Sequence, residues 1–286
     1  MHRSKKFLVE LLNSFVPMPE LPEVETVCRQ LHRRLAGKRI VGVEMWKTGR
    51  EFLGGDQFVK AVINRRIEKV YRRAKAIIFH FGDGAMVGHL KMTGKFIFVR
   101  DGYRQEKHDR MLFVLDDGTR VVWSDVRQFG YLKVFNVTEL EQVLAKYGPE
   151  PLETSVSDLA DRLLKPKTRM LKVALLDQAT IAGIGNIYVD EACHRAGVLP
   201  TRRLGSLSGD ERERVATSAQ EVLKASLAQK GTSANDYVDT EGKQGGFLSL
   251  LRVYQRTGKP CLTCTSPIEK VVVGGRGTHF CSNCQC

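Results

Sequence analysis

The sequence lacks any apolar run close to the roughly 20 residues that a helix needs to cross a bilayer. It also has no low-complexity tract and no internal repeat, and 42% of its 286 residues are hydrophobic. These absences argue against a membrane protein, a repeat array or a disordered chain, and favour a soluble protein of two domains with a smaller appendage. Basic residues precede an apolar stretch at 5–12, but Glu10 and Asn13 interrupt it, so no signal peptide is predicted.

Cysteine is scarce outside one C-terminal pattern. Of the seven cysteines, four lie in C-x-x-C pairs, while Cys28, Cys193 and Cys286 are scattered. A small secreted protein would use its cysteines as a disulfide framework, whereas this distribution fits a reducing compartment. We therefore expect a cytoplasmic protein.

Acidic residues are too few to balance the basic ones. The chain has 45 Lys and Arg against 32 Asp and Glu, which gives a formal net charge of +13. The basic residues are spread along the chain rather than gathered in a tail, which indicates a basic folded surface and a polyanionic partner. Two alternatives for the charge stay open, namely an unusually basic solvated surface and binding to anionic membranes.

Short β-type segments dominate from about residue 19 to residue 135. Residues 24–35 have apolar side chains at helical spacing, which predicts one early amphipathic helix. Apolar runs between Gly and Asp-Gly turns then predict strands at 40–43, 58–63, 76–81, 85–90, 96–99, 111–115, 120–123 and 131–135. Many strands with little helix indicate a β-sandwich or a barrel.

The second half of the chain has a different pattern. Residues 148–152 form a rigid linker rich in proline, and the segments after it predict helices at 159–164, 170–176, 186–196 and 209–230. A polar, glycine-rich loop at 232–246 precedes the last segment. The change of pattern indicates a second, mainly helical domain.

The most specific motif by spacing is C-terminal. Cys261 and Cys264 form one C-x-x-C pair, Cys281 and Cys284 form another, and sixteen residues separate the pairs. This spacing is typical of a zinc site in which four thiolates complete a tetrahedron, leaving no open position for catalysis. We expect one structural Zn²⁺; a redox C-x-x-C is the alternative, although it does not need two pairs. The residues between the pairs predict a hairpin that presents Arg276 between glycines, which suits a phosphate.

A second glycine motif, Gly183-Ile184-Gly185-Asn186, opens a predicted helix. It fails as a dinucleotide fingerprint, because Tyr188 stands where a third glycine is needed and no strand precedes it. A helix N-terminus that faces a phosphate accounts for this motif better.

The most informative residues are Met-Pro-Glu-Leu-Pro-Glu-Val-Glu at 18–25. They resemble the start of the formamidopyrimidine-DNA glycosylase family, in which the initiator Met is removed and the secondary amine of the exposed proline attacks the sugar of a damaged nucleotide. An α-amino group titrates at about 8 and a lysine at about 10.4, so more of the terminal amine is free base at neutral pH. Inside a longer chain the proline nitrogen is a tertiary amide. We therefore expect residues 1–17 to be a mis-assigned extension; proteolytic activation is the alternative.

The resemblance covers the chain from Met18 to Gln285 and implies catalytic roles. It implies that Pro19 is the nucleophile, that Lys75 contacts phosphate and assists the first elimination, and that Arg276 contacts the lesion phosphate and helps the second. Glu20 stands beside the nucleophile, where a carboxylic acid is needed to protonate the sugar ring oxygen.

The resemblance also implies contacts with DNA. Met92 would enter the base stack where the damaged base leaves, and Arg127 and Phe129 would fill the gap, since inserted side chains offset part of the unstacking cost. The remaining contacts that it implies, to the DNA backbone or near the base pocket, fall on His89, His108, Lys167, Lys172 and Asn186. A structural role is the alternative for each histidine, and a solvated charge run is the alternative for Arg72 and Arg73.

The sequence therefore predicts a bacterial-type enzyme of base-excision repair. By resemblance it would remove oxidised purines from double-stranded DNA, cleave the strand at abasic sites by β,δ-elimination, and act as a cytoplasmic, nucleoid-associated monomer without a redox cofactor. The implied fold is α+β and multidomain: a β-sandwich with flanking helices at 18–150, a helix-two-turns-helix domain at 151–248 and a zinc-finger β-hairpin at 249–286.

Two alternative functions remain. The endonuclease VIII group shares the mechanism but prefers oxidised pyrimidines, and Leu21 together with the zinc hairpin favours the purine enzyme. A non-catalytic protein that binds damaged DNA would keep the scaffold without the chemistry. Departures from the family pattern are few, namely Gln255 for a common Gly, Ser282 for a usual Pro and the additional Cys286.

Overall fold

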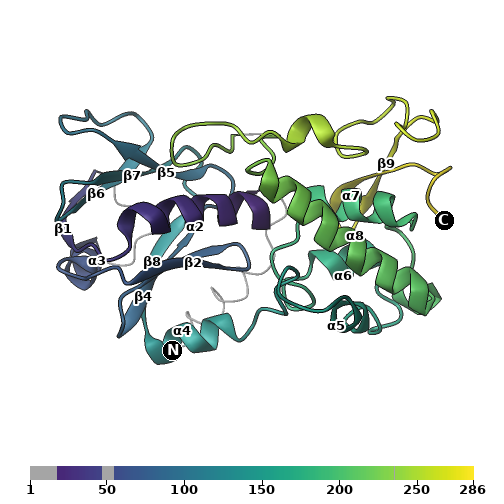
Figure 1. Ribbon diagram of the computed structural model, residues 1–286, viewed down its shortest axis with the longest axis horizontal. Helices are drawn as coiled ribbons and strands as arrows, with labels where there is room; N and C mark the ends of the chain where they lie inside the picture. Colours follow the sequence, from purple (N-terminus) through teal and green to yellow (C-terminus); the bar gives the residue numbers. More distant parts are fainter. Residues whose placement is uncertain (1–17, 47–54, 235) are drawn as a thin grey trace. The chain divides into compact units, whose positions relative to one another are not determined.

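The computed structural model describes residues 18–46, 55–234 and 236–286, so the predicted extension at 1–17 lies outside the described residues. The chain forms two compact units (Figure 1): a β-rich unit of residues 18–145 and 229–246, and a helical unit of residues 146–228 and 247–286. The loop 229–246 thus belongs to the β-rich unit, whereas the sequence analysis placed it in the helical segment. In the described residues, no helix is long and apolar enough to cross a membrane.

The β-rich unit contains two antiparallel sheets of four strands, which confirms the predicted sandwich. The first sheet has the order β1 (Ile40–Met45), β6 (Asp109–Leu115), β7 (Arg120–Asp125), β5 (Gly94–Val99). The second has the order β2 (Lys69–Arg73), β3 (Ala76–His80), β4 (Gly84–His89), β8 (Tyr131–Asn136). Half of the neighbouring strand pairs follow each other in sequence, and Lys75 lies in the turn of one such pair, β2 and β3. The turn that carries Met92 connects β4 to β5, and the turn that carries Arg127 and Phe129 connects β7 to β8, so both pass from one sheet to the other.

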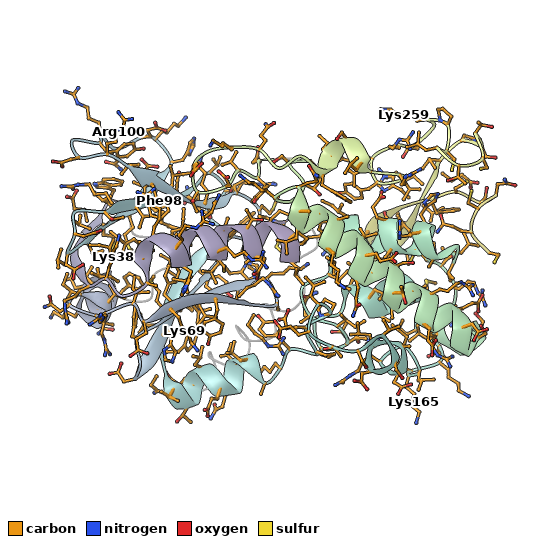
Figure 2. The ribbon with its side chains drawn as sticks, viewed as in Figure 1. Lys38, Lys69, Phe98, Arg100, Lys165 and Lys259 are labelled. Carbon is orange, nitrogen blue, oxygen red and sulfur yellow. The ribbon has the colours of Figure 1, made fainter. Side chains whose placement is uncertain are left out.

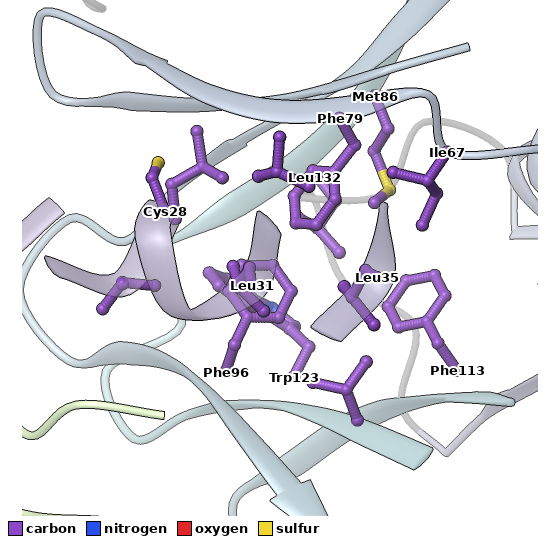
Figure 3. Close-up of a cluster of buried hydrophobic side chains, with 14 of the residues drawn as sticks. Cys28, Leu31, Leu35, Ile67, Phe79, Met86, Phe96, Phe113, Trp123 and Leu132 are labelled. Carbon is purple, nitrogen blue, oxygen red and sulfur yellow. The ribbon is translucent and has the colours of Figure 1, made fainter. Parts of the chain in front are cut away.

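Helix α2 (Leu21–Leu35) shares one apolar cluster with both sheets (Figure 3). Leu31 and Leu35 come from the helix, Phe96 and Trp123 from the first sheet and Phe79 from the second. The ring centres of Phe96 and Trp123 are 4.8 Å apart, and those of Phe79 and Phe96 are 5.4 Å apart. Burial of each apolar side chain of this size contributes about 1.5–3 kcal/mol to the free energy of unfolding. The cluster therefore provides a rigid support for the turns.

One predicted strand is wrong: residues 58–63 lie largely in helix α3 (Gly55–Val62). Phe58 and Val62, four residues apart, are both buried, which is a helical period that a short apolar run does not distinguish from a strand. Helix α4 (Val137–Leu144) was not predicted, although its start carries a capping signature. The side chain of Asn136 accepts the N–H of Glu139 at 2.9 Å, and Glu139 accepts the N–H of Asn136 at 3.1 Å.

The helical unit confirms the predicted change of structure. Its helices are α5 (Val156–Asp161), α6 (Leu171–Leu176), α7 (Asn186–Ala196) and α8 (Gly209–Ala228), with the 3-10 turns η1 (Leu204–Ser206) and η2 (Phe247–Leu250). Helix α7 ends at Gly197, whose φ of 70° is the left-handed conformation that closes many helices. The predicted C-terminal hairpin is formed by β9 (Glu269–Val273) and β10 (Arg276–Phe280).

The turn of this hairpin consists of two glycines. Gly274 and Gly275 have φ of 57° and 78°, which is the conformation that a two-residue hairpin turn requires and that glycine adopts without strain. Arg276 pairs with Val273 across the turn, so the arginine follows the tip directly.

Basic side chains come from separate segments of both units, as Lys69, Arg100, Lys165 and Lys259 illustrate (Figure 2). All four are exposed. This agrees with the even distribution of basic residues along the sequence and with a folded basic surface rather than a basic tail.

Candidate active site and metal centre

Pro19 and Glu20 are both buried at the start of α2. Glu20 is the residue that precedes the helix, and its backbone N–H donates to Oε2 of Glu23 at 2.8 Å. Pro22 suits the first turn, since the N–H that proline lacks has no partner there in a helix. The local sequence therefore fixes the backbone of Glu20 directly after Pro19, at a helix end that favours negative charge.

Glu23 links this helix start to the loop 229–246. Its Oε1 accepts the backbone N–H of Thr232 at 2.7 Å. Gly231 has a φ of 92°, and a Cβ atom at this position would lie 2.8 Å from the same oxygen. The loop therefore approaches the buried carboxylate of Glu23 at position 231, where only glycine fits.

Lys75 lies in the turn between β2 and β3 and is buried, with 9% of its surface exposed. Arg72 fixes the same turn: its Nε donates to Oε2 of Glu25 at 3.0 Å, and its Nη1 donates to the carbonyl of Ala74 at 2.9 Å. The side chain of Arg72 is only 4% exposed, so the interpretation of this residue as a solvated charge is wrong. Its planar guanidinium group donates to two acceptors at once, and a run of basic residues in the sequence does not reveal this role.

His89 is buried beside the turn that carries Met92. Its Nδ1 accepts the backbone N–H of Lys91 at 3.0 Å, and its ring lies 5.6 Å from that of Tyr131. Burial, followed by the charges of Lys91 and Lys75, holds the pKa of His89 well below its ordinary value. The ring is therefore neutral, and its burial favours support of this turn over direct contact with DNA.

Two turns of the β-rich unit bring the predicted inserting residues together. Met92 is partly exposed, Arg127 is exposed, and Phe129 is 58% exposed, with its ring centre 5.8 Å from Cζ of Arg127. The backbone N–H of Arg127 donates to Oγ1 of Thr93, next to Met92, at 2.9 Å. His108 is partly exposed, and its carbonyl accepts the N–H of Asp125, at the start of the second turn, at 3.0 Å.

The four cysteines of the C-terminal pattern meet as predicted. Their Sγ atoms all lie within 4.8 Å of one another, with Cys261 and Cys284 at 3.8 Å and Cys264 and Cys281 at 3.4 Å. One thiolate from each residue around a common centre is the arrangement that fits Zn²⁺. Nε2 of His194 is 3.7 Å from Sγ of Cys261, as expected of a group that supports a metal ligand.

A buried polar network fixes the hairpin within the helical unit. Nζ of Lys172 lies 2.6 Å from Oδ1 of Asp190 and donates to the carbonyl of Gly277 at 3.1 Å, and Nδ2 of Asn186 donates to the same carbonyl at 3.1 Å. Oδ2 of Asp190 accepts the backbone N–H of His279 at 2.8 Å. Two residues that follow Arg276 in β10, Gly277 and His279, are thus tied to α6 and α7.

The two lysines predicted to contact DNA in this unit differ. Lys167 is exposed, and its carbonyl accepts the N–H of Gly205 at 2.9 Å. Lys172 is completely buried in its ion pair with Asp190. The surroundings of Lys172 therefore favour an indirect role, through the position of the hairpin, over a direct contact with a base.

Glu191 holds the segment that leads to the first C-x-x-C pair. Its carboxylate accepts the backbone N–H groups of Arg252, Val253 and Tyr254 at 2.8, 2.9 and 2.8 Å. Burial raises the pKa of Glu191 above its ordinary value, although these N–H groups act in the opposite direction. The sequence analysis missed Asp190 and Glu191; the available signal was a pair of adjacent carboxylates between apolar residues of a predicted helix.

Three family models match the chain. They are the formamidopyrimidine-DNA glycosylase N-terminal domain at residues 18–132, the formamidopyrimidine-DNA glycosylase H2TH domain at residues 147–237, and a zinc finger found in FPG and IleRS at residues 258–285. Among curated proteins, the formamidopyrimidine-DNA glycosylase of Heliobacterium modesticaldum is 44% identical over 277 residues, covering 94% of this chain and all of the relative. That of an Exiguobacterium species is 41% identical over 276 residues, covering 94% and 99%.

Solved structures of the same family are also similar. A mutant Lactococcus lactis enzyme in complex with DNA containing Fapy-dG aligns with a TM-score of 0.86 and 32% identity, covering 93% of this chain and 99% of that one. The Lactococcus lactis enzyme with DNA containing an abasic site gives a TM-score of 0.85 at 32% identity and the same coverage. The Thermus thermophilus protein gives 0.83 at 36% identity, covering 93% and 98%.

Proposed function

This chain belongs to the formamidopyrimidine-DNA glycosylase family, and from that premise we propose how its own residues carry out the reaction. The protein is a base-excision repair enzyme for oxidised purines, a bifunctional DNA glycosylase and abasic-site lyase. We propose that it acts on double-stranded DNA containing an oxidised purine or an abasic site. The complexes of the Lactococcus lactis enzyme with DNA of these two kinds support this substrate class.

In the first stage, Pro19 with a free amine attacks C1′ of the damaged nucleotide. The bond from N to C1′ forms, the glycosidic bond breaks, and its electron pair leaves with the base; the amine nitrogen loses its proton, and this loss balances the proton that the base takes up. Glu20 then donates a proton to the sugar ring oxygen as the ring opens to an iminium ion. The observation that carries this assignment is the start of α2, where Glu20 is buried and its backbone is held by Glu23 directly after Pro19.

In the second stage, the iminium ion makes the C2′ proton acidic. Loss of that proton expels the 3′-phosphate, and a second elimination expels the 5′-phosphate. We assign Lys75 to the first elimination and Arg276 to the second, where a cation stabilises a leaving phosphate. Support comes from the way in which each is held, Lys75 in the turn that Arg72 fixes and Arg276 after the Gly274–Gly275 turn.

Met92, Arg127 and Phe129 are proposed to fill the space of the extruded nucleotide. The partly exposed side chain of Met92 and the exposed ring of Phe129 lie on turns that a hydrogen bond joins, which supports this role, since such groups offset part of the cost of unstacking. His108, Lys167 and Asn186 are proposed to contact the DNA backbone. His89 is proposed to act through the turn that carries Met92, and Lys172 through the hairpin that carries Arg276.

The protein holds one structural zinc ion at Cys261, Cys264, Cys281 and Cys284. When bound, the ion supplies a cross-link between the two C-x-x-C pairs. The residues of the chain then position Arg276: Asp190 and Lys172 hold the hairpin, and Glu191 holds the segment before it.

We further propose a monomer in the bacterial cytoplasm, associated with the nucleoid and not with a membrane. One chain carries every proposed site residue, and none of the seven cysteines forms a disulfide, which suits a reducing compartment. We keep domain boundaries near residues 150 and 248 as a proposal, except that the loop 229–246 is assigned to the β-rich unit with which it groups.

Covalent trapping tests this mechanism. Two proteins, verified by mass, are compared: one begins at Pro19, and the other retains residues 1–17. With duplex DNA containing 8-oxoguanine and borohydride, the first should form a reduced covalent adduct and the second should not, because only the first has a secondary amine at Pro19. Equal trapping by both proteins would contradict Pro19 as the nucleophile.

A further inference from the structure

We propose that Thr93 and Asp125 are positioning residues that join the turn 91–93 to the turn 125–130, so that Met92, Arg127 and Phe129 act as one rigid wedge. The inference rests on the proposed insertion of these three side chains into DNA. It adds a device, below the surface, that keeps the two turns in a single arrangement before DNA is bound.

The carboxylate of Asp125 is the centre of this device. It is 1% exposed; its Oδ1 accepts the hydroxyl of Thr93 and the backbone N–H of Arg127, the latter at 3.2 Å, and its Oδ2 accepts the N–H of Gly130 at 2.7 Å. Oγ1 of Thr93 in turn accepts the N–H of Arg127 at 2.9 Å. Every partner of the carboxylate is a donor, which matches an ionised acid that can only accept.

The packing below the turns leaves little room for another arrangement. A Cβ atom on Gly130 would lie 2.7 Å from Cζ2 of Trp123 and 2.9 Å from Oδ2 of Asp125. A Cβ atom on Gly94, next to Thr93, would lie 2.7 Å from Cη2 of the same tryptophan. The backbones of both turns therefore rest on Trp123, which is completely buried in the main apolar cluster.

In contrast to the buried Trp123, side chains of the turn 125–130 are exposed to solvent. Val126 is 47% exposed and Phe129 is 58% exposed, while Gln128 between them has a φ of 60°, which bends the turn. A wedge with a fixed backbone loses less conformational entropy when it enters the base stack than a flexible loop does. Thr93 follows Met92 in the chain, and its hydroxyl bonds to the other turn. Met92 should therefore enter the base stack together with Arg127 and Phe129.

The test uses variants that change single hydrogen bonds. Thr93→Val keeps the shape and removes the hydroxyl, Thr93→Ser keeps the hydroxyl, and Asp125→Asn places an amide N–H against groups that also donate. The readouts are the stopped-flow fluorescence of 2-aminopurine beside 8-oxoguanine, the excision rate, the cleavage rate of a preformed abasic site, and the melting temperature.

Thr93→Val and Asp125→Asn should slow both the fluorescence step and excision by about 10-fold or more, as expected when hydrogen bonds to a charged group are lost. Thr93→Ser should remain close to the parent protein. Cleavage of the preformed abasic site should fall less, because no base has to leave the stack. A variant that is only less stable would lower the melting temperature without separating these rates.

The proposal is overturned if folded Thr93→Val inserts and excises as fast as the parent protein. Should Thr93→Val not fold, Thr93→Ala provides the same loss of the hydroxyl in a smaller side chain, and the same comparison with Thr93→Ser decides. A parent protein that excises without a fluorescence step would contradict the wedge and this inference, but not the role of Pro19. A parent protein without excision would contradict the proposed function itself.

Discussion

The two units of the chain hold their functional side chains by different means. In the β-rich unit, the turns that carry Lys75 and Met92 join strands whose side chains fill an extended apolar cluster that includes Trp123. In the helical unit, the hairpin that carries Arg276 rests on buried charged groups and on a small cluster that includes Val253, Ile268 and the metal-binding cysteines. Apolar burial needs no ligand, whereas a small core of this kind needs a metal, so the two units should respond differently to the same perturbation.

Removal of the metal should have the largest effect, confined to the helical unit. Cys264→Ser, or zinc removal with a chelator, should lower DNA affinity by about 100-fold or more, since structural zinc contributes folding free energy directly. Hydrogen exchange should increase in the hairpin and stay unchanged in the strands of the β-rich unit. Cys286→Ser is the matched control, because this exposed cysteine lies outside the cluster of four.

Measurement of the zinc content of active protein can contradict this prediction. Soluble protein that contains no zinc and still excises 8-oxoguanine would show that the hairpin is held without the ion. The contrast drawn between the two units would then be wrong.

The buried ion pair should give the next largest effect. Lys172→Met leaves the carboxylate of Asp190 without its ammonium partner, and breaking a buried pair costs about 3–5 kcal/mol of the free energy of unfolding. Adding Asp190→Leu should recover part of the loss, because an apolar pair replaces the charged one. Urea denaturation of the zinc-loaded protein measures both changes.

An exposed ion pair in the same unit serves as the control for this measurement. Glu221→Gln breaks the pair with Arg195, whose two side chains are 57% and 46% exposed, and should cost less than about 1 kcal/mol. Equal effects of Lys172→Met and Glu221→Gln would contradict a structural role for the buried network.

The smallest effect should appear in the β-rich unit, as a dependence of stability on pH. The folded protein holds the pKa of His89 well below that of the unfolded chain, about 6.5, so the unfolded state binds an extra proton in acid. The contribution of His89 to stability is therefore complete above pH 6.5 and is lost as the pH falls below it, by up to about 1.4 kcal/mol per pH unit. His89→Asn keeps an acceptor for the N–H of Lys91 and should flatten this dependence between pH 6.5 and 5.

Thermal or urea unfolding at several pH values measures the difference between the two proteins. The parent protein and His89→Asn should differ in the slope of stability against pH below 6.5. Parallel curves would show that the acid sensitivity arises from other groups.

Local patterns in the sequence predicted the parts of the molecule that depend on neighbouring residues. The spacing of the four cysteines, the glycine motif before α7 and most strands of the sandwich follow rules of short range, and the structure has them. Residues 58–63 were misread because a short apolar run fits a helix and a strand equally well. The capping signature at Asn136 and Glu139 was available and would have predicted α4.

The supporting residues were not predictable in this way, because their partners are remote in sequence. Asp190 bonds to His279, 89 residues away, and Thr93 bonds to Asp125, 32 residues away. Arg72 pairs with Glu25 across 47 residues. A sequence pattern shows that such residues are charged or polar, but only the fold shows which groups they satisfy.

The central claim, that Pro19 is the nucleophile, is tested most directly by locating the covalent bond. Protein beginning at Pro19 is reacted with DNA containing 8-oxoguanine, reduced with borohydride and digested, and the peptide that carries the nucleotide remnant is identified by mass. The account predicts the remnant on the nitrogen of Pro19 in the N-terminal peptide. A remnant on the side chain of Lys75, with Pro19 unmodified, would contradict it.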